Sequence, residues 1–402
     1  MLFDLSIRGH HPNYLRHLIK YWYDHKLSGS LSIVVSPKFL LEHGEVVALA
    51  VSCSQSQVKF VSITTEEETA LNSRKSFLKR AVRNFQEWKL LRKYTALLKA
   101  THCLIMYFDT YELLLALGAQ SPCPFSGIYF RPTFHYGEFS NYQFSWREAL
   151  QKWREKLLLS RLANNLQLKT LFCLDPFVSK YLGSKFLSRV NAVTLPDPVE
   201  TFDRYEFQSH DCRQKLGIEP NRRVFLLFGS LTSRKGIWQL LEAIETLSPS
   251  LCQNMCLLLV GESNVETQLT SKIKAICQAK SIQIISRYEF IPEPEVPTYF
   301  QLADVILAPY QRHVGMSGIL LLAAAAQKPV LSSDYGLMGE LVRSYKLGIT
   351  VDSTKPEQIA RGMSQFLLED LEKLSNRALM KNFAEQNSPE KFAQIIFQYC
   401  LN

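Results

Sequence analysis

The chain has 402 residues, of which 47% are hydrophobic and 21% charged, with a formal net charge of +9 at pH 7. This composition excludes a disordered or fibrous protein, and the length predicts two domains of about 200 residues each. No apolar run reaches the roughly 18 residues of a transmembrane helix, and the amino terminus lacks a signal-peptide pattern. The nine cysteines, an odd number without a C-x-x-C pair, fit a reducing compartment, so a cytoplasmic protein is expected.

The positive charge is concentrated in one half of the chain. Residues 1–200 contain 25 Lys and Arg against 16 Asp and Glu, whereas residues 201–402 contain 21 of each. The whole excess therefore lies in the first half, and we expect the two halves to have different partners.

Short apolar runs alternate with helical stretches along the whole chain. Runs of four to six apolar residues are typical of parallel strands buried on both faces, and their alternation with helices indicates α/β domains with doubly wound parallel sheets. The expected strands cover residues 2–7, 31–36, 58–63, 103–108, 127–130 and 170–174 in the first half, and 224–229, 256–261, 282–286, 304–309 and 329–333 in the second. Because ligands bind beyond the carboxyl ends of such strands, functional residues are expected in the loops that follow them.

A domain boundary is expected in the segment LPDPVETFDRYEF, residues 195–207, which contains two prolines and few apolar residues. We predict an N-terminal Rossmann-like domain over residues 1–198 and a C-terminal one over residues 199–386. Residues 387–402 are predicted to form a helix that packs back on the first domain.

Polar residues follow several expected strands of the first half. In IRGHHPNYLRHLI, Gly9 permits a tight turn before a helix, and His10 can donate to a hydroxyl or a phosphate group. Asp109 follows the strand CLIMYF, and Arg131 and His135 follow the strand GIYF. The alternative for each is an ordinary surface or structural hydrogen-bonding role.

Residues 74–93 have the pattern of an amphipathic helix with a strongly basic face. The expected apolar face is formed by Phe77, Ala81, Phe85 and Trp88. The expected basic face is formed by Lys75, Lys79 and Arg83, with Arg80 beside them. Like charges at this spacing repel by about 0.2–0.5 kcal/mol per pair, and an anionic partner would relieve that repulsion. The alternative is a helix packed on the core whose basic face is solvated.

The stretch FGSLTSRKGIWQLLEAI, residues 228–244, predicts a strand, a tight turn and a helix. Gly229 allows the chain to turn sharply and the backbone to approach a ligand closely. Arg234 and Lys235 stand before the helix, whose amino end already favours an anion. Lys supplies a point charge for phosphate, and Arg supplies a planar fork. The alternative is a strand–helix turn with solvated cations.

A second stretch, GMSGILLLAAAAQKPVLSSDYG from Gly315 to Gly336, contains a helix without polar side chains over residues 318–326, which predicts a buried helix. Ser317 is a candidate N-cap, and Gly315 and Gly318 allow close approach of the backbone. Two helix amino ends that follow strands of one sheet make a diphosphate clamp. The alternative is a buried helix capped by Ser317 and met by water.

These motifs resemble the donor-binding domain of retaining glycosyltransferases of family 4, which have the GT-B fold of two facing Rossmann-like domains. The family's diphosphate-binding turn, G-R-L-x-x-x-K-G, is matched by Gly229, Leu231, Lys235 and Gly236, with Ser230 in place of the Arg and Arg234 as its candidate substitute. Gly261 in CLLLVGE resembles the Gly of the next family strand. The segment 288–310, which begins with Tyr288 and Phe290, resembles the one that packs on the nucleobase.

The likeness continues in AAAAQKPVLSSDYGLMGELV, which resembles the family's E-A-M-A-x-G-x-P-V run and the turn after it. It implies a donor-binding role for the loop of Gly315, Met316, Ser317 and Gly318. The family's E-x7-E pair is missing, because its positions fall on Leu322 and on Val314 or His313. Ribose and sugar recognition must therefore differ from the family's usual scheme.

The resemblance implies a glycosyltransferase that moves a sugar from a nucleotide diphosphate donor to an acceptor with retention. Lys235 and Arg234 would carry the charge of the leaving diphosphate. His135 matches a family His beside the reacting sugar, and Asp109 would orient the sugar with it. The acceptor-side loop would include Gly9, His10 and Arg131. No cofactor is expected beyond the nucleotide-sugar co-substrate, and no metal ion, because the sequence has no Asp-x-Asp motif.

A catalytically inactive GT-B-like nucleotide-binding or scaffold protein is the main alternative, which the missing carboxylates permit. A nicotinamide enzyme is disfavoured because FGSLTSRKG lacks the G-x-G-x-x-G spacing, and no nucleic-acid partner is expected because aromatics and cations do not interleave as in known modules. The acceptor is open between lipid-linked and saccharide molecules. A lipid-linked acceptor would bring the first domain into peripheral contact with an anionic membrane.

Overall fold

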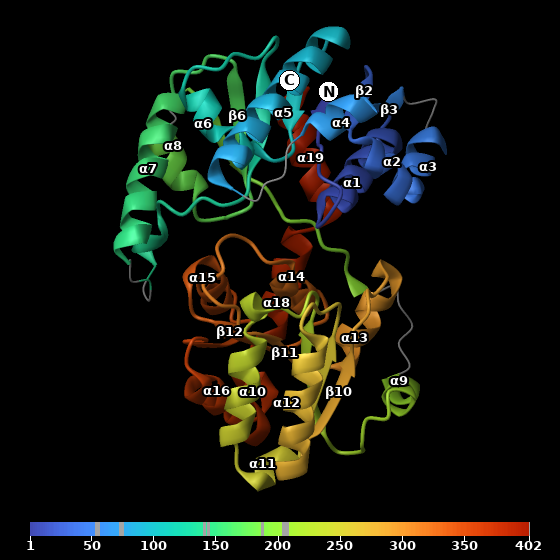
Figure 1. Ribbon diagram of the computed structural model, residues 1–402, viewed down its shortest axis with the longest axis vertical. Coiled ribbons are helices and arrows are strands. Elements are labelled where there is room, and N and C mark those ends of the chain that lie inside the picture. The colour runs from blue at the N-terminus through green and yellow to red at the C-terminus, as the bar shows by residue number, and fades with distance from the viewer. Residues whose placement is uncertain are drawn as a thin grey trace. The chain divides into compact units, whose positions relative to one another are not determined.

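The computed structural model describes residues 1–52, 57–71, 76–139, 142, 145–185, 189–202 and 209–401. The chain divides into two compact units, each with its own sheet (Figure 1). The N-terminal unit comprises Met1–His135, Phe144–Pro198 and Pro389–Asn402, and the C-terminal unit comprises Tyr136–Gln143 and Val199–Ser388. Among the described residues, no helix is both long and apolar enough to cross a membrane.

The N-terminal unit is built on a seven-stranded sheet in the order β3-β2-β1-β4-β5-β6-β7, in which all neighbours are parallel. Its strands are β1 (Leu2–Phe3), β2 (Leu31–Val35), β3 (Val58–Ser62), β4 (Cys103–Ile105), β5 (Phe125–Tyr129), β6 (Leu168–Cys173) and β7 (Asn191–Thr194). Its helices are α1 (His11–Asp24), α2 (Pro37–Glu42), α3 (Gly44–Ser52), α4 (Thr65–Ala70), α5 (Phe77–Leu97), η2 (Phe108–Thr110), α6 (Glu112–Ala116), α7 (Trp146–Leu162), α8 (Ser179–Lys185) and α19 (Pro389–Cys400). In β1, Leu2 lies opposite Ile33 of β2 and Leu104 of β4.

Helices cover both faces of this sheet. Trp88 of α5 and Leu159 of α7 are buried in one apolar cluster with Phe125 of β5. On the other face, Phe172 of β6 contacts the ring of Tyr399 in α19. Helix α7 begins at a capping box, and its buried positions recur at helical spacing, so local signals and core packing agree.

The C-terminal unit is built on a six-stranded parallel sheet in the order β10-β9-β8-β11-β12-β13. Its strands are β8 (Arg223–Phe228), β9 (Met255–Val260), β10 (Gln283–Arg287), β11 (Val305–Ala308), β12 (Val330–Ser333) and β13 (Gly348–Val351). Its helices are η3 (Tyr136–Glu138), α9 (Ser209–Lys215), η5 (Ser233–Lys235), α10 (Ile237–Thr246), α11 (Pro249–Gln253), α12 (Glu266–Ala279), η6 (Glu293–Glu295), α13 (Val296–Leu302), α14 (Gly318–Ala325), α15 (Gly336–Ser344), α16 (Pro356–Leu368), α17 (Leu371–Leu374) and α18 (Arg377–Gln386).

This sheet also lies between two layers of helices. Helices α10, α12 and α16 lie on one face of the sheet (Figure 1). They share one apolar core with alternate residues of the strands. On the other face, α14 packs against α13 and α18. The uninterrupted apolar strand β9 is buried at every residue, as expected for a central parallel strand.

The fold class predicted from the sequence, two α/β domains with doubly wound parallel sheets, is confirmed. The buried apolar helix is confirmed as α14, in which Ile319, Leu320 and Leu321 are buried. Two strands were not predicted, β7 and β13, and both lie at a sheet edge, where less apolar sequence is needed. The first strand is shorter than expected because the Asp4 carboxylate accepts a bond from the Ser6 amide and turns the chain.

The apolar face predicted for residues 74–93 is wrong. Ala81 and Phe85 are exposed, the latter to 48%, while Trp88 is buried. The buried face of α5 also carries Glu87, whose carboxylate forms an ion pair with Arg83, with 2.7 Å between Oε1 and Arg83 Nε. The helix is thus rotated from the predicted orientation, because its central part is set by Trp88 and by the pairing of Glu87. The predicted basic residue Lys75 lies outside the described residues.

Candidate functional site

Both predicted phosphate-binding loops of the C-terminal unit lie at one point of its sheet. The strand order reverses between β8 and β11, which is where open α/β sheets bind ligands. The loop after β8 contains Gly229 and Lys235, and the loop after β11 leads to the amino end of α14. The two motifs therefore come together although about 80 residues separate them in sequence, as expected from the topology of doubly wound sheets.

The Lys235 side chain is folded back under the turn at Gly229. Gly229 has φ +93°, and a Cβ atom placed on it would lie 3.1 Å from Lys235 Nζ. The ammonium group donates to the Phe228 carbonyl at 2.9 Å and to the Tyr310 hydroxyl, and it lies 4.4 Å from the centroid of the Tyr310 ring. A glycine is needed at this turn for both reasons, its backbone conformation and the space under it.

Lys235 is a buried cation that has no anionic partner among the described residues. Its side chain is largely shielded, with the residue 8% exposed, and in the described part of the chain its bonding partners are a carbonyl and a phenol. A buried charge is costly unless it is paired, so such a site is stabilised by an anion from outside.

Arg234 lies beside the same tyrosine. Its guanidinium group is 5.5 Å from the Tyr310 ring centroid, and Nη1 lies 3.2 Å from His313 Nδ1. The loop is held by Ser353, whose hydroxyl donates to the Tyr310 carbonyl at 2.8 Å. Tyr310 thus organises both cations, a role that the sequence did not reveal because an aromatic residue at a strand end is usually core.

The amino end of α14 is open. Ser317 occupies the N-cap position, as predicted, but its side chain makes no capping bond, which disfavours the alternative of a helix capped by Ser317. Within the described residues, no hydrogen bond engages the backbone N–H groups of Gly318 and Ile319. A Cβ atom on Gly318 would meet nothing within 4 Å. An open helix amino end with free N–H groups favours an anion.

The remaining predicted donor-site residues take several positions. In the loop before α14, the Gly315 amide donates to the Tyr136 hydroxyl at 3.1 Å, and the Met316 carbonyl lies 3.3 Å from His313 Nε2. Ser230 is exposed beside Gly229, and Gly261 packs against the Gly229 carbonyl so closely that a Cβ atom would lie 2.4 Å from it. Tyr288 is half-buried, whereas Phe290 is 72% exposed. Their donor-binding roles stay predictions.

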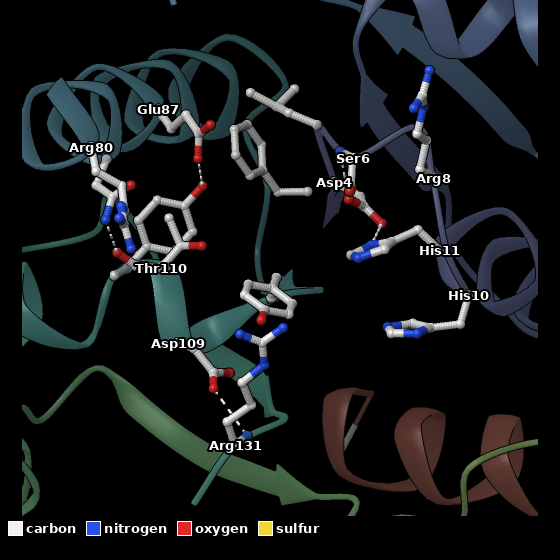
Figure 2. A pocket seen from close by; sticks show the side chains of 15 residues that line it. Asp4, Ser6, Arg8, His10, His11, Arg80, Glu87, Asp109, Thr110 and Arg131 are labelled. Atoms are coloured by element: carbon white, nitrogen blue, oxygen red, sulfur yellow. Dashed lines mark hydrogen bonds and ion pairs between the residues drawn. The ribbon is translucent and has the colours of Figure 1, made fainter. Parts of the chain in front are cut away.

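The N-terminal unit contains a cavity of about 550 Å³ (Figure 2). It opens where the strand order reverses between β1 and β4, the position that corresponds to the site of the C-terminal unit. The predicted residues His10, Asp109 and Arg131 all line it, whereas His135 does not. Gly9, with φ +74°, makes the turn before α1.

Asp109 is held by the backbone of the next strand end. Its carboxylate accepts the Phe130 amide at 2.9 Å and the Arg131 amide at 3.0 Å. Burial raises the pKa of Asp109 to about 6, although these hydrogen bonds and the Arg131 charge oppose the shift. Asp109 therefore fixes the position of Arg131, and its proposed contact with a sugar stays a prediction.

His135 lies in the interior of the N-terminal unit. Its Nε2 atom is 2.9 Å from the Asp175 carboxylate, and neither side chain is exposed. Its ring stacks on that of Tyr181 at 5.7 Å. These contacts suit a residue that holds the loop, and a direct role beside the reacting sugar stays a prediction.

A second carboxyl group near Asp109, that of Glu112, is only partly compensated by the Arg154 charge and the Tyr129 hydroxyl. Glu112 lines a small cavity of about 160 Å³ with Asp109 and Glu155, and in the described residues its Oε1 atom is buried without a hydrogen-bond partner. Burial first, and then the charges of Glu155 and Asp109, raise the pKa of Glu112 to about 8. Glu155, by contrast, accepts bonds from Tyr129 and Thr133 at 2.6 Å.

We expect Glu112→Gln to stabilise the protein at pH 9 but not at pH 5. Because the pKa of Glu112 is higher in the folded protein than its ordinary value of 4.5, its contribution to stability is complete below pH 4.5 and is lost as the pH rises through 8. Melting temperatures of both proteins at the two pH values test this. The exposed Glu138→Gln is the matched control, and an equal effect of Glu112→Gln at both pH values would contradict the assignment.

Comparisons with known proteins agree with this arrangement. Residues 208–387 match the family "Glycosyl transferases group 1". The putative glycosyltransferase YtcC of Bacillus subtilis is 26% identical over 157 residues, and the lipopolysaccharide glucosyltransferase WaaG of Escherichia coli is 26% identical over 190 residues. These alignments cover 38% and 46% of this chain, and 38% and 49% of the relatives, so the chain spans less than half the length of each.

Solved structures share the fold over both units. The structure of WaaG has a TM-score of 0.62 at 16% identity and covers 98% of both chains. The structure of Anabaena HepE in complex with UDP has a TM-score of 0.64 at 13% identity and covers 99% of this chain and 98% of that one.

The protein thus has the GT-B fold, with two α/β units that each contain a parallel sheet. Its C-terminal half is a domain of the glycosyl transferases group 1 family. The resemblance found in the sequence motifs is confirmed for this half.

Proposed function

We propose that the protein is a glycosyltransferase that moves a sugar from a nucleotide diphosphate donor to an acceptor. The observation that carries this proposal is the buried Lys235 ammonium group, which has no carboxylate partner among the described residues and lies at the sheet position where α14 opens. A diphosphate supplies the missing negative charge. Its oxygens accept from Lys235, from Arg234 and from the free N–H groups of Gly318 and Ile319.

The reaction proposed is a transfer with retention. The bond between the anomeric carbon and the donor phosphate oxygen breaks, and a bond from that carbon to the acceptor hydroxyl forms on the same face. The acceptor proton passes to the departing phosphate, so no strongly basic side chain is needed. Lys235 and Arg234 stabilise the negative charge that develops on the leaving diphosphate. This electrostatic stabilisation is expected to be their main contribution to lowering the reaction barrier.

The missing Glu pair restricts how the donor sugar and ribose are held. His313 contacts Arg234, and Leu322 is an apolar residue of α14, so neither position offers a carboxylate. Donor recognition in this protein therefore depends on backbone groups and cations more than on carboxylates. The comparisons lend no support to a catalytically inactive protein.

A thermal-shift panel of nucleoside diphosphates, nucleosides and nucleotide sugars tests the proposal. A ligand present at 100 times its Kd stabilises a protein by about 2.7 kcal/mol, which shifts the melting temperature measurably. We expect at least one diphosphate, UDP among those tested, to stabilise the chain while its nucleoside does not. A panel in which no diphosphate shifts the melting temperature would contradict donor binding.

The acceptor is proposed to bind in the N-terminal unit, in the cavity lined by His10, Asp109 and Arg131.

We also propose that this unit works at an anionic membrane surface and that the protein is cytoplasmic. The strongest feature for a membrane is not the predicted basic helix but α7, whose exposed side carries apolar residues at spacings of four, three and four. They are Trp146 (72% exposed), Leu150 (59%), Trp153 (63%) and Leu157 (41%).

The charged side chains of α7 also suit contact with an anionic membrane. Arg147, Arg154 and Arg161 are exposed, whereas the acidic residues of the helix point elsewhere: Glu148 closes the capping box and Glu155 is buried. A helix that exposes two tryptophans and two leucines between arginines is typical of one that lies in a membrane interface. Anionic lipid is the partner with complementary charge.

We expect the wild type to pellet with anionic vesicles but not with neutral ones, and less as salt is raised. The double variant Trp146→Ala/Trp153→Ala should stay in the supernatant, because it removes the largest apolar groups of the exposed side. A matched control, Leu41→Ala/Leu368→Ala, removes exposed apolar groups elsewhere and should pellet like the wild type. If the tryptophan variant pellets equally, α7 is not the membrane surface.

A further inference from the structure

We infer that the cavity of the N-terminal unit is a binding site for a phosphate monoester, held by Arg8, Arg80 and Arg131. The inference rests on the proposed function only where it assigns this phosphate to the acceptor. Binding of the phosphate itself can be tested without any sugar transfer. The three arginines come from the loop after β1, from α5 and from the end of β5, and all of them line the cavity.

The carboxylates of the cavity are already used by internal donors. Asp4 accepts from His11 Nδ1 at 2.7 Å and from the Ser6 amide at 2.9 Å. Glu87 lies 2.7 Å from Arg83, which is not among the residues that line the cavity. Asp109, as described above, accepts two backbone amides. The acidic groups are thus occupied, and they leave few oxygens for a ligand's donors.

The arginines differ from these acids. Within the described residues, no hydrogen bond or ion pair engages the side chain of Arg8, Arg80 or Arg131. In Figure 2 the dashed line from Asp109 reaches the backbone of Arg131, while the guanidinium group points up into the pocket, and Arg80 and Arg8 stand on opposite sides of it. All three are exposed and can turn toward a ligand.

The amino end of α1 adds to the positive potential that the three arginines create in the cavity. The helix begins at His11, carries no acidic residue in its first turn and has no side-chain cap from His10. His10 lines the cavity, where its ring stacks on that of Phe130 at 4.8 Å. The positive end of a 14-residue helix therefore opens beside the three arginines.

The number of donors indicates a phosphate monoester more than a carboxylate. Each guanidinium group presents a planar fork that matches two oxygens of an anion. A phosphate monoester has three terminal oxygens and close to two negative charges at neutral pH, whereas a carboxylate has two oxygens and one charge. The cavity volume of about 550 Å³ is in the range of small-molecule sites and leaves room for a sugar or a glycerol group.

Two sources of this group can be separated by experiment. A soluble sugar phosphate is represented by glucose 6-phosphate, with glucose as its uncharged control, in calorimetric titrations of the full chain. A lipid headgroup is represented by phosphatidylcholine vesicles with phosphatidic acid, a phosphate monoester. Vesicles with the same content of phosphatidylglycerol, a diester, control for general attraction to an anionic surface.

We expect glucose 6-phosphate or the phosphatidic acid vesicles to bind, and glucose and the matched controls to bind at least about tenfold more weakly. Arg8→Gln, Arg80→Gln and Arg131→Gln should each lower the affinity about tenfold or more, as expected for a lost charge-assisted hydrogen bond. Arg92→Gln, an exposed arginine of α5 outside the cavity, should change nothing. Circular dichroism checks that each variant is folded.

Failure of this inference differs from failure of the proposed function. If neither monoester binds, or if the three cavity variants bind like the wild type, the phosphate site is wrong. If glucose 6-phosphate binds through the arginines but no nucleotide sugar is consumed, the site stands and the transferase proposal fails. UDP affinity, measured on the same variants, should be unchanged, because its proposed contacts are in the C-terminal unit.

Discussion

Lys235→Met should weaken the binding of UDP about 10- to 150-fold while leaving the affinity for uridine unchanged. The variant removes one charge-assisted hydrogen bond to the diphosphate, worth about 1.5–3 kcal/mol, and nothing that the nucleoside touches. The fold should survive for two reasons. Methionine is a flexible side chain that fills the same space, and the substitution removes a buried charge that has no ion-pair partner in the described part of the chain. Calorimetric titration of both ligands measures the difference.

A matched control separates the local effect of Lys235 from a general loss of positive charge. Lys272 lies in α12 of the same unit, where it pairs with Glu245 at 2.6 Å, so Lys272→Met removes the same charge far from the two loops. Its UDP affinity should equal that of the wild type. Equal losses for UDP and uridine in the Lys235 variant would mean that this side chain does not contact phosphate.

Gly318→Val should abolish UDP binding without unfolding the protein. The Cβ position at Gly318 meets nothing within 4 Å, and the residue does not need a positive φ, so the larger side chain fits the free protein. Its two methyl groups then occupy the space in front of the α14 amino end, where the diphosphate is proposed to lie. Forcing extra atoms into a filled site costs about 1–3 kcal/mol or more.

The control for this variant is Gly44→Val. Gly44 also stands at the first position of a helix, α3, and a Cβ atom there meets nothing within 4 Å. The two substitutions carry the same change in backbone and helix propensity, but only one faces the proposed ligand. Unchanged UDP affinity in a folded Gly318→Val protein would rule out the helix amino end as part of the site.

The positions of the candidate residues in the C-terminal unit were predictable because the sequence signals are local. A glycine after a buried strand and two cations before a helix predict a phosphate-binding turn, and Gly229 and Lys235 occupy these positions. What could not be predicted is how Lys235 is held. Its contact with Tyr310 depends on the pairing of β8 with β11, which brings together loops far apart in sequence.

The N-terminal cavity shows the limit of sequence reasoning more clearly. Arg131 was predicted from its place after a strand, but Arg8 and Arg80 join it only because β4 pairs with β1 and α5 packs over that edge. The rotation of α5 was predicted wrongly, because its apolar pattern is compatible with two buried faces. Packing of Trp88 and the pairing of Glu87 bury the face that the pattern did not favour. Edge strands such as β7 were missed because half-exposed strands need few apolar residues.

The most direct test of the central claim is phosphorus NMR of the full chain incubated with UDP-, GDP- and ADP-linked sugars, with glucose 6-phosphate as acceptor. We expect the wild type to consume at least one of the nucleotide sugars and to release its nucleoside diphosphate. The Lys235→Met variant should catalyse the same reaction much more slowly. If a nucleoside diphosphate binds but the wild type consumes every nucleotide sugar no faster than Lys235→Met, the protein is a nucleotide binder and not a transferase.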